Sequence, residues 1–407
     1  MAGRDPGERG RVSSPLELLF DLTFVVAVGT SATQFSELLA EGDPGQAVIA
    51  FLMAMFAITN AWISFSWFAS AFDTDDWLYR VLTMVQMIGV VVLALGLPAM
   101  FHSVRQGDHL ELRAIVIGYV VMRIAMGLQW WRAARQSAAY HDVGIANIRW
   151  IAIAQLGWIV IGFAPLPLGA ALAGFVLFGT LEVVLPRLTQ GWAGGTPWHP
   201  HHIAERYSLF AIITLGEGVV GTVASSGALL GGPDGTQWTG NAVAIVVAGV
   251  GLTFGMWWVY FATPFGELLV HRRNLGYVFG FGHMAVFMAV AGAGAGLHLA
   301  GLQLEHHSEI GDTTVVLALA LPVGLYLLAV YTLHALLLSA TDRFHLLLLA
   351  ATLAVLVAAV LLSAAGVAVA VCLIVVMAAP LVTVLGYETV GHRHQREMLE
   401  RIAAPGH

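Results

Sequence analysis

Four ionisable side chains lie inside apolar runs of this sequence, where an uncompensated charge is costly. Glu217 stands about fourteen residues into one run, in the motif T-L-G-E-G, and Arg123 lies near the centre of another, in G-Y-V-V-M-R. His283 and Asp21 occupy similarly apolar segments. A charged group at the centre of a bilayer costs about 2.5 to 3.5 kcal/mol, so each needs a partner, water or a function. Carboxylates and histidines at such depths can bind protons or cations, and an arginine can act as the counter-charge.

Each of these residues also has a structural interpretation. Glu217 and Arg123 could form a structural ion pair, or Glu217 could exchange the arginine for a proton or cation. His283 is either a hydrogen-bonded packing residue or a proton-handling group. Asp21 follows Glu17 by four residues, so both carboxylates share a helix face near an N-terminus, where they would complement the helix dipole.

The composition places these residues in a membrane protein. The chain has 407 residues, of which 58% are hydrophobic and 11% are charged, and its mean hydropathy is +0.80. Soluble proteins carry roughly 25% charged residues, so most of this surface must face lipid. The net charge of -7, with arginines scattered singly or in pairs, argues against a nucleic-acid partner.

Apolar runs long enough to cross a bilayer recur along the chain and predict an all-α fold of about 12 transmembrane helices. A transmembrane helix needs about 20 apolar residues. The runs begin near Pro15, Gln46, Trp77, Glu111, Asn147, Leu168, Ile203, Trp238, Arg273, Thr313, Arg343 and Gly366. The boundary between the last two, within residues 343–388, is the least distinct.

The arginines predict an orientation, because basic residues beside spans favour the cytoplasmic side. With the N-terminus inside, only Arg105 and Arg113 fall in outer loops. An even number of spans then leaves both termini in the cytoplasm. We expect a multi-pass protein of the bacterial inner (plasma) membrane.

The two halves of the chain resemble each other. E-L-L-F-D-L from Glu17 matches E-R-Y-S-L-F from Glu205, and W-F-A-S-A-F matches Y-F-A-T-P-F, each followed by an arginine eight residues after its last phenylalanine. Six spans per half would relate the halves by an axis along the membrane normal, as in some transporters. The predicted segments are a cytoplasmic tail (1–14), a six-helix half (15–190), a cytoplasmic linker (191–202), a second six-helix half (203–390) and a cytoplasmic tail (391–407).

Two local patterns concern metals and helix ends. His201, His202 and Glu205 have spacings that one helix face could bring together around a metal, but not in the H-E-x-x-H order of a zinc site. We expect no cofactor, because nucleotide-binding and hydrolase motifs are missing from the sequence. Asp76 is expected to cap the third span, with neighbouring aspartates paired to Arg80 or Arg273.

Several of these motifs together resemble the bacterial low temperature requirement A (LtrA) family. They are P-L-E-L-L-F-D-L-T-F-V-V-A-V, F-D-T-D-D-W, G-Y-V-V-M-R and H-I-A-E-R-Y-S-L-F-A-I-I-T-L-G-E-G-V-V, and the resemblance extends over nearly the whole chain. It implies a multi-spanning membrane protein with motif residues Glu17, Asp21, Glu205, Arg206 and Glu217. A fainter similarity, to lysosomal-type potassium channels with two six-span repeats, concerns architecture only, because their F-S-D motif is missing here.

The function that these observations favour is ion- or proton-coupled transport of a small solute or ion, through a pathway that includes Asp21, Arg123, Glu217 and His283. A cation channel with two six-helix repeats is the main alternative. An intramembrane enzyme acting on lipid, or a structural or stress-response membrane protein, are further alternatives. We expect a protein that is not an enzyme, whose partners are the lipid bilayer and an unknown small solute or ion. A homo-oligomer is compatible with the sequence.

Overall fold

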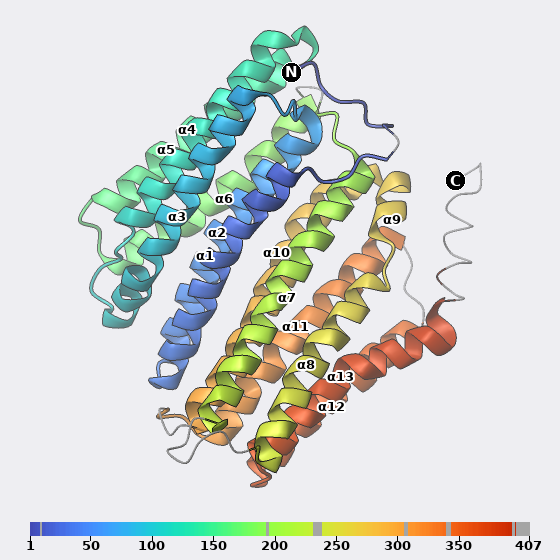
Figure 1. Ribbon diagram of the computed structural model, residues 1–407. Coiled ribbons are helices and arrows are strands. Elements are labelled where there is room, and N and C mark those ends of the chain that lie inside the picture. The colour runs from blue at the N-terminus through green and yellow to red at the C-terminus, as the bar shows by residue number, and fades with distance from the viewer. Residues whose placement is uncertain are drawn as a thin grey trace. The chain divides into compact units, whose positions relative to one another are not determined.

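The computed structural model describes residues 1–8, 10–192, 195–230, 238–304, 308–338, 343–392 and 395. Helices and the loops between them account for all of these residues, and the described part of the chain contains no strand (Figure 1). The expectation of an all-α fold is confirmed.

Twelve helical segments within the described residues are long and apolar enough to cross a membrane. Most consist of one helix, while α8 is extended by the short helix α9 (Phe265–His271). The long helices are α1 (Pro15–Ala40), α2 (Pro44–Phe72), α3 (Trp77–Gln106), α4 (Arg113–Gln136), α5 (His141–Phe163), α6 (Leu168–Trp192), α7 (Pro200–Leu230), α8 (Gly240–Phe261), α10 (Gly276–Leu304), α11 (Asp312–Leu338), α12 (Arg343–Ala364) and α13 (Val369–Gly386).

The predicted starting points agree closely with these helices. The spans expected from Pro15, Trp77, Leu168, Arg273 and Arg343 begin at those residues. The expected break between the last two spans is confirmed, because α12 ends at Ala364 and α13 begins at Val369. Long apolar side chains remain exposed along the helices, as lipid-facing surface requires; Leu95, for example, is 75% exposed.

The chain divides into two compact units whose boundaries fall within α1 and α7. The first contains Met1–Gln34 and Gly45–Arg206, and the second contains Phe35–Pro44 and Tyr207–His407. The last residues of α1 belong to the second unit. These units therefore do not coincide with the two halves of the sequence.

In the first unit, α3, α4, α5 and α6 pack in chain order, each against the next. The α3–α4 pair packs closely where glycines meet. A Cβ atom added to Gly89 would lie 2.6 Å from the carbonyl oxygen of Gly118. Small residues at such crossings let helix backbones approach in a membrane.

In the second unit, α10, α11, α12 and α13 also pack in chain order, and α13 contacts α8 as well. Gly296 of α10 lies against α11, where an added Cβ would be 2.8 Å from the Cα of Leu319. At its end, α13 continues as a π-helical turn, Tyr387–Gly391.

The loop between α2 and α3 confirms the expected caps and ion pairs. The Asp76 carboxylate accepts a hydrogen bond from the backbone N–H of Tyr79 at 3.0 Å, which caps α3. It also pairs with Arg132 of α4, and this hydrogen-bonded arginine holds the pKa of Asp76 below its usual range. Asp75 pairs with Arg80 at 2.8 Å, as expected.

Candidate functional site

Glu17 is fixed at the entrance of α1 by a capping box. Ser14 precedes the helix and Pro15 occupies its first position, a residue order that favours helix initiation. The Ser14 N–H donates to Glu17 Oε2 at 2.8 Å, and the Glu17 N–H donates to Ser14 Oγ at 3.3 Å. One turn later, Asp21 presents its carboxylate on the same face.

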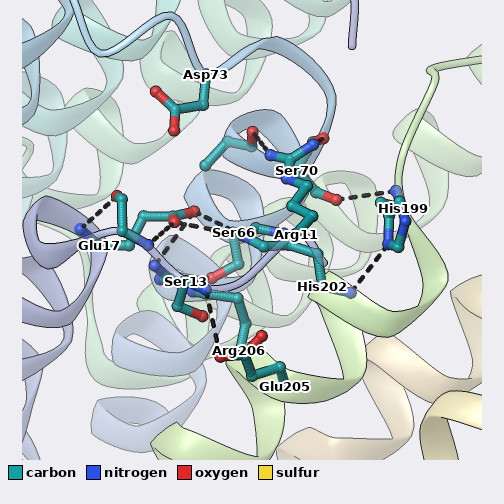
Figure 2. A network of polar contacts seen from close by, with 12 residues as sticks. Arg11, Ser13, Glu17, Ser66, Ser70, Asp73, His199, His202, Glu205 and Arg206 are labelled. Atoms are coloured by element: carbon teal, nitrogen blue, oxygen red, sulfur yellow. Dashed lines mark hydrogen bonds and ion pairs between the residues drawn. The ribbon is translucent and has the colours of Figure 1, made fainter. Parts of the chain in front are cut away.

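Arg206 of α7 contacts both carboxylates. Its Nη2 donates to Asp21 Oδ1 at 2.6 Å, and its Nη1 lies 3.4 Å from Glu17 Oε1. His202, one turn earlier in α7, places its Nε2 3.3 Å from the Glu17 carboxylate. None of these four side chains is more than 1% exposed. We call Glu17, Asp21, His202 and Arg206 the end cluster. Figure 2 labels three of its members, Glu17, His202 and Arg206.

One face of α2 completes the surroundings of the end cluster. Trp62 Nε1 donates to Asp21 Oδ1 at 2.7 Å, and Arg206 Nη2 donates to Ser66 Oγ at 3.2 Å. The guanidinium of Arg206 also lies 5.7 Å from the Trp62 ring centroid, within the range of a cation–π contact. Trp62 and Ser66 are four residues apart, so a single helix face supplies both contacts.

His199 caps α7 with its ring. Its Nδ1 accepts a hydrogen bond from the backbone N–H of His202 at 3.2 Å, and its Nε2 lies 2.8 Å from the carbonyl oxygen of Glu8. Because the carbonyl can only accept, Nε2 carries the hydrogen and the imidazole is neutral. Burial lowers the pKa of His199, in agreement with that tautomer.

The N-terminal segment is attached to the same end of the first unit. Arg11 is 8% exposed and donates to the carbonyl oxygens of Ser70 at 2.5 Å and Ala69 at 2.9 Å, in the last turn of α2. Figure 2 shows Arg11 beside Ser70. The backbone N–H of Arg4 donates to the carbonyl oxygen of Ala71 at 2.9 Å. A cation at a helix C-terminus satisfies carbonyls that have no partner within the helix.

The end cluster retains hydrogen-bonding capacity. Among the described residues, five of its buried polar atoms have no hydrogen-bond partner, namely Glu17 Oε1, Asp21 Oδ2, His202 Nδ1, and Nε and Nη1 of Arg206. An unsatisfied buried polar group costs about 1 to 3 kcal/mol, which a site selected only for packing would not retain. Two of these atoms, Glu17 Oε1 and Arg206 Nη1, face each other at 3.4 Å as an ion pair. The other three are one carboxylate oxygen and two nitrogens with hydrogen-bonding capacity left, so the arrangement can bind a proton.

A second charged centre lies among α2, α4, α5 and α6. Arg123 Nη2 is 3.2 Å from Glu182 Oε2, and their side chains are 7% and 6% exposed. The Glu182 carboxylate also accepts hydrogen bonds from Tyr119 at 2.6 Å and from Asn60. Within the first unit, the partner of Arg123 is therefore Glu182, a carboxylate that the sequence analysis did not pair with it. Sequence position alone could not identify the pair, because residues 59 apart meet only through the fold.

Glu217 differs from the other buried carboxylates. It lies in the middle of α7, is 8% exposed, and makes no hydrogen bond or ion pair with the described residues of its unit. Its neighbour is Gly294 of α10, where an added Cβ would lie 2.7 Å from the Cβ of Glu217. Gly294 lies in the segment A-G-A-G-A-G (residues 291–296) of α10, whose small residues allow close helix packing, and α7 is the helix it packs against at this point.

His283 is enclosed by aromatic rings in the second unit. Its Nδ1 lies 2.7 Å from the carbonyl oxygen of Phe279, and the Tyr260 hydroxyl lies 3.0 Å from its Nε2. The carbonyl can only accept, so Nδ1 carries the hydrogen and the hydroxyl donates to Nε2. The side chain is 0% exposed. This geometry favours the packing interpretation of His283.

The three weak metal candidates do not converge. His201 is exposed, His202 faces Glu17, and a carboxylate oxygen of Glu205 accepts a hydrogen bond from the Ser13 N–H at 3.3 Å. Across the described residues, no group of three or more histidine, cysteine or acidic residues could hold a metal ion.

Sequence reasoning missed several residues of these centres. Trp62, Ser66 and Ser70 recur every four residues within α2, and this polar stripe on an apolar helix was the signal that could have identified them. Arg11 could not be found in this way, because only the folded N-terminal segment brings it to α2.

Comparison with known proteins agrees with the architecture. The family model described as bacterial low temperature requirement A protein matches residues 12–380. The chain is also similar to the uncharacterized protein RA0937 of Rhizobium meliloti (strain 1021), with 25% identity over 318 residues, which is 74% of this chain and 72% of that protein. The matched region includes the end cluster, the Arg123–Glu182 pair and Glu217. With more than half of its length matched, the chain belongs to the bacterial low temperature requirement A (LtrA) family.

Proposed function

We propose that this protein is an ion- or proton-coupled membrane transporter in which the carboxylate of Glu217 binds the coupling proton or cation. The observation that carries the proposal is a contrast among buried carboxylates. Glu17 and Asp21 contact Arg206, and Glu182 contacts Arg123. Glu217 is also buried, at 8% exposure, yet it has no cationic partner among the described residues of its unit.

Electrostatics gives this contrast a functional meaning. An unpaired carboxylate within a span is stabilised by binding a proton or a cation, and release of that ion makes its position in the apolar span unfavourable. Occupancy and conformation would therefore be coupled at Glu217. A purely structural bundle gains nothing from such a residue.

The packing around Glu217 supports a direct link between this residue and α10. Gly294 faces Glu217, and Gly221, one turn further along α7, faces the α10 backbone, since a Cβ there would lie 2.5 Å from the carbonyl oxygen of Gly294. A change in the occupancy of Glu217 would therefore act on α10 through this close backbone contact.

The architecture proposed for transport consists of two repeats of six spans. In each unit four successive helices pack in chain order, α3 to α6 in the first and α10 to α13 in the second. This parallel, together with the paired sequence motifs, supports internal repeats related by an axis along the membrane normal. We place the protein in the bacterial inner membrane with both termini cytoplasmic, on the arginine distribution.

The other pathway candidates take supporting roles in this proposal. Asp21 is held by Arg206 and Trp62, and Arg123 is held by Glu182, so neither is assigned the coupling ion in this proposal. His283 supports α10 by packing. The protein then acts through binding and movement and not as an enzyme.

The test is an electrical measurement on purified protein in proteoliposomes adsorbed to a solid-supported membrane. Proton, sodium, potassium and anion gradients are applied to the native protein, to Glu217→Gln and to Gly216→Ala. An added Cβ at Gly216 would have no atom within 4 Å, so this neighbour is a matched control. We expect a saturable current that Glu217→Gln abolishes and Gly216→Ala retains. Equal currents in all three proteins would contradict the proposal, and unitary currents in single-channel recordings would favour a channel.

A further inference from the structure

The buried charges at the N-terminal end of the first unit do not balance. Among the residues that are less than one tenth exposed, this end contains three carboxylates, Glu17, Asp21 and Asp73, and two guanidinium groups, Arg11 and Arg206. His199 is neutral, because one ring nitrogen accepts and the other donates a hydrogen bond. With a neutral His202, the buried set carries one net negative charge, and that charge is costly where solvent is excluded.

We propose that this buried set is a proton-binding site, which holds one proton at neutral and mildly alkaline pH and is distinct from Glu217. The proton is shared by the end cluster and Asp73 as a coupled group rather than belonging to one residue. His202 can bind the proton, because its Nε2 lies beside Glu17 and its Nδ1 has no hydrogen-bond partner among the described residues.

Asp73, at the edge of the buried set, also lies in surroundings that favour a bound proton. It follows α2 and is 9% exposed. Burial and the negative charge of Glu17 raise the pKa of Asp73 above its usual range, so the surroundings already favour a bound proton.

Other charged groups nearby do not cancel the imbalance. On the N-terminal segment, Arg4 pairs with Glu8 at 2.8 Å and lies 4.0 Å from Asp73, but its side chain is 33% exposed. On the adjoining elements, Asp75 pairs with Arg80, Asp76 pairs with Arg132, and Glu205 accepts a hydrogen bond from the Ser13 N–H. The buried Tyr79 hydroxyl of α3 has no hydrogen-bond partner among the described residues, and a tyrosine adds no charge near neutral pH.

A proton suits this site better than a metal cation. Hard cations prefer about six or more oxygen ligands. Here the carboxylate oxygens left without hydrogen bonds are Glu17 Oε1 and Asp21 Oδ2, and Arg206 lies beside both residues. A guanidinium within contact distance opposes a second fixed cation but tolerates a proton that neutralises a carboxylate or an imidazole.

The experiment counts protons when the protein unfolds. Purified protein in weakly buffered detergent at about pH 8 is unfolded with sodium dodecyl sulfate, and the released protons are titrated. At that pH an unfolded histidine or aspartate binds almost no proton, so the native protein should release one more proton than Glu17→Gln, whose buried charges balance without it. Glu205→Gln, which removes a half-buried carboxylate outside the set, should release as many protons as the native protein.

A pH series provides the second readout. One extra proton in the folded state means that the folding equilibrium constant falls up to tenfold for each pH unit above neutrality, and Glu17→Gln should lose this dependence. Asp73→Asn should lose the extra proton and the pH dependence as well. Because Asp73 lies at the edge of the buried set, this variant replaces Glu17→Gln if Glu17→Gln does not fold.

Equal proton release by the native protein, Glu17→Gln and Asp73→Asn would overturn the proposal. So would a native release that disappears as sodium or potassium is raised at constant pH, because a metal cation would then occupy the site. Neither the proton count nor the pH series measures transport. A negative result in them therefore does not affect the role proposed for Glu217, and a negative transport result does not affect the proposed proton-binding site.

Discussion

Gly294 and Glu217 are in direct backbone contact across the α7–α10 seam. A Cβ atom on Gly294 would lie 2.7 Å from the Cβ of Glu217 and 2.8 Å from its carbonyl carbon, closer than real Cβ atoms approach their neighbours. Only glycine lets the two helices meet at this point, so the environment of the Glu217 carboxylate depends on a residue that has no side chain.

Gly294→Ala should therefore impair both folding and transport. The added methyl group meets backbone as well as side-chain atoms, so the helices must separate, and overpacking of this kind costs about 1 to 3 kcal/mol. The measurement is the free energy of unfolding in detergent, together with current in proteoliposomes. Gly227→Ala is the matched control on α7, since an added Cβ there would have no atom within 4 Å. Identical behaviour of the two variants would argue against a close seam.

Arg206→Met should be among the most destabilising single changes in the first unit. It leaves Glu17 and Asp21 buried without their counter-charge, and breaking a buried ion pair costs about 3 to 5 kcal/mol. The loss should shrink at acidic pH, where the carboxylates become protonated. Arg80→Met is the comparison, because Arg80 is 61% exposed in its pair with Asp75 and such pairs contribute about 1 kcal/mol or less. Unfolding titrations at two pH values decide between these expectations.

Asp76 allows capping and charge pairing to be separated. Asp76→Asn retains a side-chain oxygen for the Tyr79 N–H but loses the ion pair with Arg132, whereas Asp76→Ala loses both. Because the folded-state pKa of Asp76 is lowered, its contribution is complete above the unfolded pKa of about 3.9 and is lost as pH falls through the folded value. The stability difference between the native protein and Asp76→Asn should thus be constant near neutrality and diminish in strong acid. A difference that grows in acid would contradict this account.

Arg11→Gln should loosen the end of α2. Charged hydrogen bonds contribute about 1.5 to 3 kcal/mol, and Arg11 donates two of them to the carbonyls of Ala69 and Ser70. Hydrogen–deuterium exchange should increase in the last turn of α2 and in the N-terminal segment. Arg4→Gln changes a more exposed arginine of the same segment and should have a smaller effect on exchange. If exchange is unchanged in Arg11→Gln, the N-terminal segment does not stabilise α2.

Much of the fold was predictable because hydropathy is local. The length and hydropathy of a run such as Arg343–Ala364 are enough to recognise it as a span, and no residue outside the run is needed. The fifth span was placed too late, from Asn147, whereas helix begins at His141. Its first turn contains His141 and Asp142, whose polarity hid the helix start from a hydropathy argument.

Most charged residues of the candidate site were predictable, but their pairs were not. Glu17 and Arg206 were predicted through the family resemblance, Arg123 through its depth in an apolar run, and Asp21 and Glu217 through both. Which cation meets which carboxylate depends on helix packing, so the sequence suggested Arg123 with Glu217 where the structure has Arg123 with Glu182. Pairing of this kind is a property of tertiary contacts and leaves no spacing signal in one sequence.

The most direct test of the central claim is to observe protonation of Glu217 itself. Infrared difference spectra of the native protein in lipid, recorded as pH and then sodium or potassium are changed, report the carbonyl stretch of a protonated buried carboxyl group. We predict a band that appears on acidification, shifts or disappears when the coupling cation binds, and is missing in Glu217→Gln while Gly216→Ala retains it. The same band in Glu217→Gln, or no band in the native protein across the pH range of transport, would contradict the role assigned to Glu217.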